Sequence, residues 1–278
     1  MARAAIIGLG EVGSALYRVA SERGSGLELY GYDILESRTV HRLEEIPAPV
    51  DHLHIATPFE NMSLFLNTVR FYVERLKPRI VVIHSTVAPG ATRMVAERLG
   101  VKAAFSPVRG KHPCIEKHLL RWPKWVAGVD EESLREATEA LKAMGLPVKP
   151  CSCEPETLEL AKIWETVYRA AMIAAWHEIH RTALRFGGDV EKIAEFIAEV
   201  HEVLRDRPVY YPGVIGGHCL IPNTRILRSV YPSKLLDFIL ESNELRREEV
   251  MDPRVERDVE RVRRVAERLT NQEYYRCG

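Results

Sequence analysis

The segment Gly8-Leu9-Gly10-Glu11-Val12-Gly13 constrains the fold of this chain more than any other feature of the sequence. It follows a short apolar run at residues 3–7 and opens residues 12–23, whose apolar side chains recur at helical spacing. A second strand pattern, residues 27–32, ends at Asp33. A glycine turn between a strand and a helix lets the backbone approach a pyrophosphate, and the helix N-terminus favours the negative charge. These residues predict a Rossmann-type domain that binds a dinucleotide.

The identity of the dinucleotide is predicted from the end of the second strand. Asp33 stands twenty residues after Gly13, where an acidic side chain accepts hydrogen bonds from ribose hydroxyls and repels a 2′-phosphate. The sequence therefore favours NAD over NADP, while the nearby Arg38 keeps the phosphorylated cofactor open as an alternative. The expected cofactor-binding residues are Gly8, Leu9, Gly10, Glu11, Val12, Gly13, Asp33, Arg38, Thr57, Pro58 and Ser85.

Strand and helix patterns alternate over the first half of the chain and then give way to helices alone. The expected strands are residues 3–7, 27–32, 52–56, 79–84, 103–105, 124–128 and 147–149. The expected helices are residues 12–23, 59–76, 91–99, 131–144, 154–186, 189–205, 233–249 and 253–270, with a loop at 208–222. Alternation of strands and helices indicates an α/β fold with a doubly wound parallel sheet. We expect a dinucleotide-binding Rossmann domain at residues 1–152 and an all-helical substrate and dimerisation domain, with a long central helix, at residues 153–278.

Composition disfavours several classes of protein. A formal net charge of zero and a pI of about 7.2 provide no global field that would recruit nucleic acid or an anionic membrane. No run approaches the roughly 20 apolar residues that span a bilayer, and the start lacks the layout of a signal peptide, so we expect a cytoplasmic protein. One glutamine and five asparagines, a scarcity of thermolabile amides, suggest a thermophile, whereas 29 arginines against 10 lysines are also explained by genome composition. Because thermophile proteins can carry intracellular disulfides, the five cysteines remain open between thiols and disulfides.

Further segments carry recognisable chemistry in a fixed order: DILESR at 33–38, STVAPG at 85–90, FSPVRG at 105–110, ELAK at 159–162, YRA at 168–170, His177-Glu178 and PGVIGGHC at 212–219. Together with the glycine loop, these segments make the chain resemble the UDP-glucose/GDP-mannose dehydrogenase family over essentially its whole length. The resemblance implies oxidation of a sugar C6 alcohol to a carboxylate with two NAD, through a thiohemiacetal and a thioester on a cysteine. By position it implies Cys219 as the nucleophile, Lys162 as the cationic partner of the oxygen and Thr86 beside the reacting centre.

The chemistry of these residue types agrees with those roles. A thiol readily makes a hydrolysable acyl intermediate, and a lysine acts as a base when neutral or stabilises an oxyanion when charged. A basic cluster follows the fifth strand pattern, at an edge where doubly wound sheets bind ligands, and carboxylate or phosphate is its natural partner. The expected substrate-binding residues are Arg109, Lys111, His112, Gly217, His218 and Asn223.

Three positions depart from the pattern of that family. Val108 replaces a glutamate, Thr166 replaces an asparagine and Asn223 replaces an aspartate. The family also has a second Rossmann-like domain after the helical region, whereas only residues 233–278 follow here. We therefore expect a short, divergent member that oxidises a CH–OH group of a smaller anionic substrate with NAD. The alternatives are a true nucleotide-sugar 6-dehydrogenase of reduced architecture and a non-catalytic NAD-binding protein.

Metal binding and macromolecular partners are not expected from the sequence. His112, Cys114 and His118, with Cys151 and Cys153, do not have the paired spacing of a zinc site. The charged helix at 253–270 interleaves acids with bases, which is typical of a solvated or subunit-covering face. The long central helix is apolar well beyond one face, so we expect a homodimer through that helix, no metal, and a small molecule as the other partner.

Overall fold

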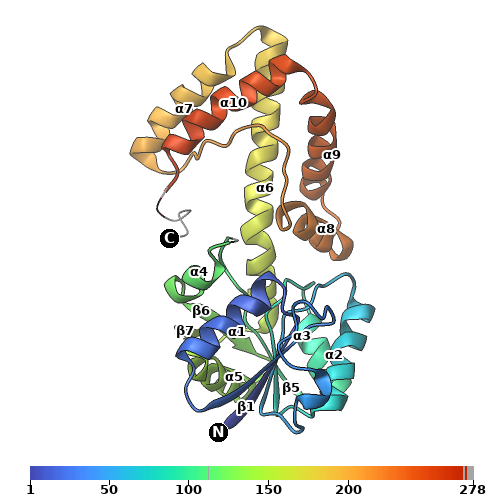
Figure 1. Cartoon of the computed structure of the whole chain (residues 1–278). Helices are drawn as coiled ribbons and strands as arrows, with labels where there is room; N and C mark the ends of the chain where they lie inside the picture. The colour runs from blue at the N-terminus through green and yellow to red at the C-terminus, as the bar shows by residue number, and fades with distance from the viewer. Residues whose placement is uncertain (112, 272, 274–278) are drawn as a thin grey trace. The chain divides into compact units, whose positions relative to one another are not determined.

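The computed structural model describes residues 1–111, 113–271 and 273 (Figure 1). The chain divides into two compact units inside the helix α6 (Pro155–Phe186). The first unit runs to Lys162 and the second begins at Ile163. The expected domain boundary, between residues 152 and 153, lies just before this helix and stays a prediction.

A seven-stranded sheet in the order β2-β1-β3-β4-β5-β6-β7 forms the centre of the first unit (Figure 1). Its strands are β1 (Ala2–Ile7), β2 (Leu27–Tyr32), β3 (His52–Ile55), β4 (Ile80–Ile83), β5 (Lys102–Phe105), β6 (Lys124–Gly128) and β7 (Val148–Pro150). All neighbouring strands pair in parallel except β5 and β6, which are antiparallel. The strand order reverses beside β1, as in doubly wound folds. The expected α/β class with a mostly parallel Rossmann-type sheet is confirmed.

Helices cover both faces of this sheet. The helices α1 (Glu11–Arg23), α4 (Ile115–Arg121) and α5 (Glu131–Ala143) pack on one face with Ile6 and Val82. The helices α2 (Met62–Leu76) and α3 (Ala91–Leu99) pack on the other face with Ile7 and Val81. Consecutive strand residues enter opposite layers, because side chains alternate along a strand. A short 3-10 helix, η1 (Leu43–Glu45), lies between β2 and β3.

Local signals in the sequence set the ends of several helices. The side chains of Asn61 and Asp130 accept hydrogen bonds from the first turns of α2 and α5, at 2.9 and 2.7 Å. Gly100, with φ of 64°, ends α3 in the left-handed conformation that glycine adopts without strain. The helix α4 was not expected from the sequence, because its seven residues are too few to show a clear period.

The second unit is entirely helical within the described residues. Besides α6 it contains α7 (Val190–Leu204), α8 (Leu220–Val230), α9 (Lys234–Glu249) and α10 (Pro253–Arg268). One apolar core joins α6 to α8 and α9, and another joins α6 to the neighbouring α7 and α10 (Figure 1). The sequence predicted residues 208–222 as loop, whereas α8 begins at Leu220 and includes Pro222. Pro222 is its third residue, where a missing N–H breaks no helical hydrogen bond. No helix among the described residues is long and apolar enough to cross a membrane.

Candidate functional site

The glycine loop has the shape that a dinucleotide requires. Gly8 has φ of 89°, and a Cβ there would lie 2.9 Å from the backbone of Ala56 and Thr57. A Cβ at Gly13 would lie 1.8 Å from the Gly8 oxygen, so this glycine lets α1 pack against the loop. Outside Gly10, by contrast, the nearest atom to a Cβ position is Nη1 of Arg38 at 3.9 Å. The backbone is thus tight where the loop packs and open where a pyrophosphate would approach.

The first turn of α1 faces this open side without a side-chain cap. Gly10 is the N-cap residue, and no side chain accepts a hydrogen bond from the first turn, in which Glu11 is exposed and Val12 packs against the core. The first N–H groups of a helix lack partners within the helix and carry partial positive charge. They are suited to an anionic diphosphate, and this supports the fit of a dinucleotide.

Asp33 organises the loop as well as facing the expected ribose position. Its Oδ2 accepts the N–H of Leu9 at 2.6 Å, and its Oδ1 accepts the N–H of Leu35 at 2.8 Å. The residue is only 9% exposed, yet an ionised carboxylate offers about four acceptor sites. Two hydroxyl groups of a ribose could therefore still donate to it.

The loops after β3 and β4 meet beside the glycine loop. The Ser85 hydroxyl donates to the carbonyl oxygen of Thr57, which lies next to Gly8 and is followed by Pro58. The Thr57 hydroxyl is buried and has no hydrogen-bond partner in the part of the chain that the structure describes. An unpaired buried hydroxyl is unusual in a folded protein and indicates a group that a ligand would satisfy. The structure thus places all the expected cofactor-binding loops at one edge of the sheet.

A buried glutamate ties the STVAPG segment to the helix that carries Lys162. Glu159, fully buried on α6, accepts hydrogen bonds from the Gly90 N–H (2.6 Å), the Thr92 N–H (2.9 Å) and the Thr92 hydroxyl (2.7 Å). Burial raises the pKa of this carboxyl, and the three hydrogen bonds oppose the shift. Lys162 follows one helical turn later and is half-buried, as is Thr86. Glu159 therefore fixes the Thr86 segment to the turn of α6 that presents Lys162.

The FSPVRG segment, residues 105–110, also lies in the first unit and is anchored to its core by Val108. Val108 is buried among the apolar side chains under α1, α4 and α5, so the position of the family's glutamate contributes to the core here. The Arg109 guanidinium donates to the carbonyl oxygen of Pro123 at 2.8 Å and lies 5.1 Å from the ring centre of Trp122. Lys111 is exposed, and its N–H donates to Nδ1 of His118 at 3.0 Å. The expected substrate residue His112 lies outside the described residues.

The second unit carries the candidate nucleophile. Cys219 is a free, exposed thiol at the N-cap position of α8, and no side chain caps that helix. Gly217 has φ of 82°, and nothing lies within 4 Å of a Cβ position there, so a substrate could approach the backbone. His218 is exposed beside it. The thiol therefore lies where the first N–H groups of a helix can bind the oxygen of a substrate.

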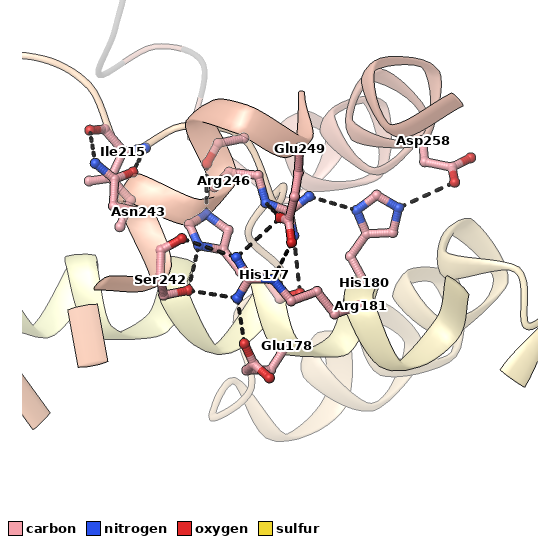
Figure 2. Close-up of polar contacts among 11 residues, drawn as sticks. His177, Glu178, His180, Arg181, Ile215, Ser242, Asn243, Arg246, Glu249 and Asp258 are labelled. Carbon is pink, nitrogen blue, oxygen red and sulfur yellow. Dashed lines mark hydrogen bonds and ion pairs between the residues drawn. The ribbon is translucent and has the colours of Figure 1, made fainter. Parts of the chain in front are cut away.

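A buried polar cluster anchors the segment that leads to Cys219 (Figure 2). Asn243 on α9 accepts the N–H of Ile215 at 2.7 Å and donates to its carbonyl oxygen at 3.3 Å. His177 on α6 contacts the carbonyl oxygen of Gly213 through Nε2 at 2.8 Å and the Ser242 hydroxyl through Nδ1 at 3.0 Å. Burial lowers the pKa of His177 to about 4, so the ring is neutral near pH 7 and donates through Nε2.

The centre of this cluster is Arg246, which is fully buried. Its guanidinium contacts Nδ1 of His180 at 3.0 Å, the carbonyl oxygen of His177 at 3.1 Å and Glu249 at 3.0 Å (Figure 2). Arg181 also pairs with Glu249, at 2.7 Å. Burial lowers the pKa of Arg246 to about 10, which leaves it charged at neutral pH. The charge is compensated, and the cluster ties α6 to α9 as a scaffold for the segment before Cys219.

Two of the departures from the family pattern contact each other. Asn223 donates through Nδ2 to the Thr166 hydroxyl at 2.9 Å, and that hydroxyl donates to the Ile163 carbonyl oxygen at 2.8 Å. Both side chains are buried. Asn223 lies on the first turn of α8, where its N–H donates to the carbonyl oxygen of Cys219. The two side chains are thus joined to each other by a hydrogen bond, and neither of them is ionisable.

Cys151 and Cys153 form a disulfide with each other, which the sequence had left open. They lie between β7 and α6 and pack against the core of the first unit. Among the residues that the structure describes, no group of three or more His, Cys, Asp or Glu side chains is arranged to hold a metal ion.

One known protein family matches part of this chain in sequence. Residues 156–244 match the central domain of the UDP-glucose/GDP-mannose dehydrogenase family. The expected resemblance is confirmed. No curated protein matches the chain in sequence.

Three solved structures illustrate the fold. A UDP-D-ManNAc dehydrogenase from Pyrococcus horikoshii is similar with a TM-score of 0.74 and 20% identity over 87% of this chain and 68% of its own. A UDP-glucose dehydrogenase from the hyperthermophilic archaeon Pyrobaculum islandicum has a TM-score of 0.69 and 22% identity over 88% and 68%. A 3-hydroxyisobutyrate dehydrogenase from Mycobacterium tuberculosis, solved with L-serine, has a TM-score of 0.65 and 17% identity over 91% and 94%. The chain therefore has the same fold as these three proteins.

Sequence reasoning missed three features of the site. It quoted the ELAK segment without assigning a role to Glu159, and no local pattern marks a side chain that hydrogen-bonds to a distant loop. It gave no role to Asn243, since a single asparagine on a helix reads as a surface residue. No role was expected for His54 or His84 either, although a histidine within or directly after an apolar strand is a visible sign of a buried polar group.

Proposed function

We propose that this protein is an NAD-dependent oxidoreductase that acts on a CH–OH group of a small anionic substrate. The observation that carries the proposal is the open space outside Gly10, at the uncapped N-terminus of α1 and beside Asp33. Tight packing at Gly8 and Gly13 with open space at Gly10 is the arrangement that a bound pyrophosphate requires. The dehydrogenase fold of the solved structures supports the same function.

Asp33 and Arg38 bear on the choice between NAD and NADP. A buried carboxylate next to the ribose position repels a 2′-phosphate and accepts hydroxyl groups. Nη1 of Arg38 lies 3.9 Å from a Cβ position at Gly10, near the expected diphosphate position. We infer that Arg38 supports the diphosphate and that the cofactor is NAD.

Bound NAD would supply the hydride acceptor at the carboxyl edge of the sheet. The chain's own residues would hold the alcohol and take its proton: Lys162 in its neutral form accepts the hydroxyl proton as the hydride leaves, or stabilises the oxygen when charged. Thr86 orients the hydroxyl, because Glu159 fixes its segment to the Lys162 turn. Buried Val108 offers no carboxylate to activate a water molecule. A single two-electron oxidation is therefore the reaction that these residues support.

The anionic character of the substrate is inferred from Arg109 and Lys111, with His112 in the same segment. Arg109 keeps further N–H donors besides the one that contacts Pro123, because a guanidinium carries five. A carboxylate is the natural partner of such a group. The 3-hydroxyisobutyrate dehydrogenase, which the chain covers over 94% of its length, is named for a substrate of this class.

A second candidate, a nucleotide-sugar 6-dehydrogenase, is favoured by one observation. Cys219 is free, exposed and placed at a helix N-terminus, as a thioester-forming nucleophile would be. Two oxidations would then yield two NADH per substrate. The neutral, self-satisfied Asn223–Thr166 pair argues against the hydrolytic half of that route.

The experiment that tests the proposal measures NADH formed from NAD with a panel of hydroxy acids, sugar phosphates and nucleotide sugars. We expect one NADH per molecule of a small hydroxy acid, with activity lost in Lys162→Met and retained in Lys142→Met, an exposed lysine of α5. Two NADH per nucleotide sugar, falling in Cys219→Ser, would instead establish the second candidate. Binding of NAD without reduction by any compound of the panel would favour a non-catalytic NAD-binding protein.

We also propose a homodimer through α6, because its second-unit portion exposes Trp164, Tyr168 and Ala175 at helical spacing. Large exposed aromatic side chains on one helix face are typical of a subunit interface.

A further inference from the structure

Three nitrogen-bearing side chains form a continuous chain inside the first unit. Nζ of Lys124, the first residue of β6, lies 3.1 Å from Nδ1 of His84, directly after β4. Nε2 of His84 lies 3.0 Å from Nδ1 of His54 on β3, and the two rings stack with centres 5.3 Å apart. Nζ of Lys124 also contacts the carbonyl oxygens of Ser106 and Pro107, the latter at 3.0 Å.

The chain of side chains is almost completely removed from solvent. The exposed fractions are 3% for Lys124, 2% for His84 and 0% for His54. His54 pairs in register with Ile6 and Val82, so it lies among the apolar residues under α1 and α5. Burying ionisable groups in such surroundings destabilises a fold unless every polar atom has a hydrogen-bond partner. The presence of this cluster therefore needs a physical explanation.

Two protonation states can be written for this chain, and they differ at one contact. Nδ1 of His84 also lies 2.8 Å from the carbonyl oxygen of Ser106, a contact that only a protonated Nδ1 satisfies. When Lys124 is charged, its three N–H groups donate to the two carbonyl oxygens and to Nδ1 of His84, and each histidine carries its proton on Nε2. When Lys124 is neutral, its two N–H groups keep the carbonyl oxygens and its lone pair accepts the His84 Nδ1–H. His54 then donates through Nδ1 to Nε2 of His84. The two states differ by one proton, which enters or leaves at Nε2 of His54.

We propose that Lys124, His84 and His54 form a buried relay that carries one proton between the carboxyl edge of the sheet and Nε2 of His54. In the outward direction Lys124 gives a proton to Nδ1 of His84, His84 gives its Nε2 proton to Nδ1 of His54, and His54 releases its own Nε2 proton. The transfers occur together, so each ring gains one N–H bond as it loses the other and no ring gains a net charge. A water molecule at Nε2 of His54 accepts the released proton.

The far end of the relay has an exit. Nε2 of His54 and Nδ1 of His52, two residues earlier on the same face of β3, are both buried, and neither has a hydrogen-bond partner among the described residues. Two unpaired buried nitrogen atoms on one strand face suit a bridging water molecule. His52 lies at the opposite end of the strand, where the charges of Asp51, Arg79, Glu136 and Glu139 act on it.

Burial, helped by nearby positive charges, keeps both histidines of the relay neutral. Burial lowers the pKa of His54 to about 3, helped by the charges of His52 and Lys124, and lowers the pKa of His84 well below its usual value. Burial, followed by repulsion from Lys162 and Arg109, lowers the pKa of Lys124. Any positive charge therefore resides on Lys124, close enough to Lys162 for the two to repel each other.

That repulsion gives the relay a use, and this step rests on the proposed function. Oxidation of an alcohol by NAD gives a carbonyl compound, NADH and one proton, and Lys162 receives the proton. A second ammonium at Lys124 then becomes unfavourable, so the relay discharges its proton through His54. Lys124 acts through Lys162 and is a positioning residue rather than a catalytic one.

The test follows the tautomers of His54 and His84 by NMR of protein labelled with ¹⁵N-histidine, across the pH range in which it stays folded; the His54→Asn variant assigns the signals. We expect the two rings to exchange tautomers together, both remaining neutral, at the pH where the Lys124 side-chain signal titrates. The exchange should vanish in Lys124→Met and persist in Lys142→Met. Fixed tautomers, a ring that becomes imidazolium, separate midpoints, or exchange that survives in Lys124→Met would each overturn the relay. The lysine signal provides the test in wild type if Lys124→Met does not fold.

A parallel assay of NADH formation separates this proposal from the proposed function. NADH formation with fixed tautomers would refute the relay and leave the oxidoreductase standing. Coupled tautomer exchange without NADH from any substrate would support the proton chain itself, while overturning both the proposed function and the link from the relay to catalysis.

Discussion

A substitution at Gly10 tests NAD binding without disturbing the packing of the fold. A Cβ at Gly10 meets only the tip of Arg38, whereas a Cβ at Gly13 would overlap the Gly8 oxygen. Gly10→Ala should therefore keep the melting temperature of the wild type and weaken NAD binding about tenfold, or about 1.4 kcal/mol, by filling the space for the diphosphate. Calorimetric titration with NAD measures the effect. Unchanged affinity in a folded variant would place the diphosphate elsewhere.

Lys124 predicts a pH dependence of stability. Burial lowers its pKa in the folded protein below the ordinary value of 10.5, so the unfolded chain binds more protons between those two pKa values. The free energy of unfolding should therefore rise with pH in that window, by at most about 1.4 kcal/mol per pH unit for one proton. In Lys124→Met this pH-dependent contribution should disappear. Urea unfolding at several pH values tests both statements; parallel curves for the two proteins would contradict them.

At the level of elements, Glu159 joins two helices by capping α3 from α6. Glu159→Ala would leave three buried donors of Gly90 and Thr92 without an acceptor. Since each unsatisfied buried donor costs about 1–3 kcal/mol, we expect a loss of about 3 kcal/mol in the free energy of unfolding. Denaturant unfolding measures it, with Glu156→Ala, a partly exposed neighbour on the same helix, as the comparison. An equal loss of stability in the two variants would show that the hydrogen bonds of Glu159 contribute no more than the ion pair of Glu156.

The contact between α6 and α8 makes a second prediction at this scale. Asn223→Asp restores the family's residue but removes the amide donor to Thr166, so it should destabilise the fold by about 1 kcal/mol. Adding Thr166→Asn supplies an amide donor opposite the new carboxylate. A double-mutant cycle should show favourable coupling between the two positions. Additive effects would mean that the two substitutions are independent.

Elements with long apolar periods were predictable from the sequence, and short or exceptional ones were not. The expected strand at residues 27–32 has the observed bounds, and α3 and α6 begin and end within one residue of expectation. The helix α8 was hidden, because Pro222 and the glycines before it resemble a loop in sequence. The antiparallel pairing of β6 has no local signal either, since strand direction depends on how the chain returns to the sheet.

For the molecule as a whole, the proposed dimer makes a prediction about α6. Tyr168 is 62% exposed on that helix, and Tyr231, between α8 and α9, is 61% exposed. Tyr168→Glu should shift the protein from dimer to monomer in light scattering, because it places a charge in an apolar interface. Tyr231→Glu has equal exposure and should leave the dimer intact. A monomeric wild type, or equal effects of both variants, would contradict the proposed interface.

The candidate site was predictable in its cofactor half and less so in its substrate half. The spacing from Gly8 to Asp33 encodes a local strand–turn–helix–strand unit, so the sequence alone locates the dinucleotide loop. Lys124 lies on β6, His84 directly after β4 and His54 on β3. Asn243, which hydrogen-bonds to Ile215, lies 28 residues away on α9. Such contacts depend on tertiary packing, which no single segment of sequence contains.

The central claim is that the first unit is an NAD site, and a calorimetric titration with NAD and NADP tests it most directly. We expect one NAD per chain, weaker binding of NADP, and a smaller difference between the two affinities in Asp33→Asn, which removes the charge that repels a 2′-phosphate. Failure of the folded protein to bind NAD, or a preference for NADP, would contradict it.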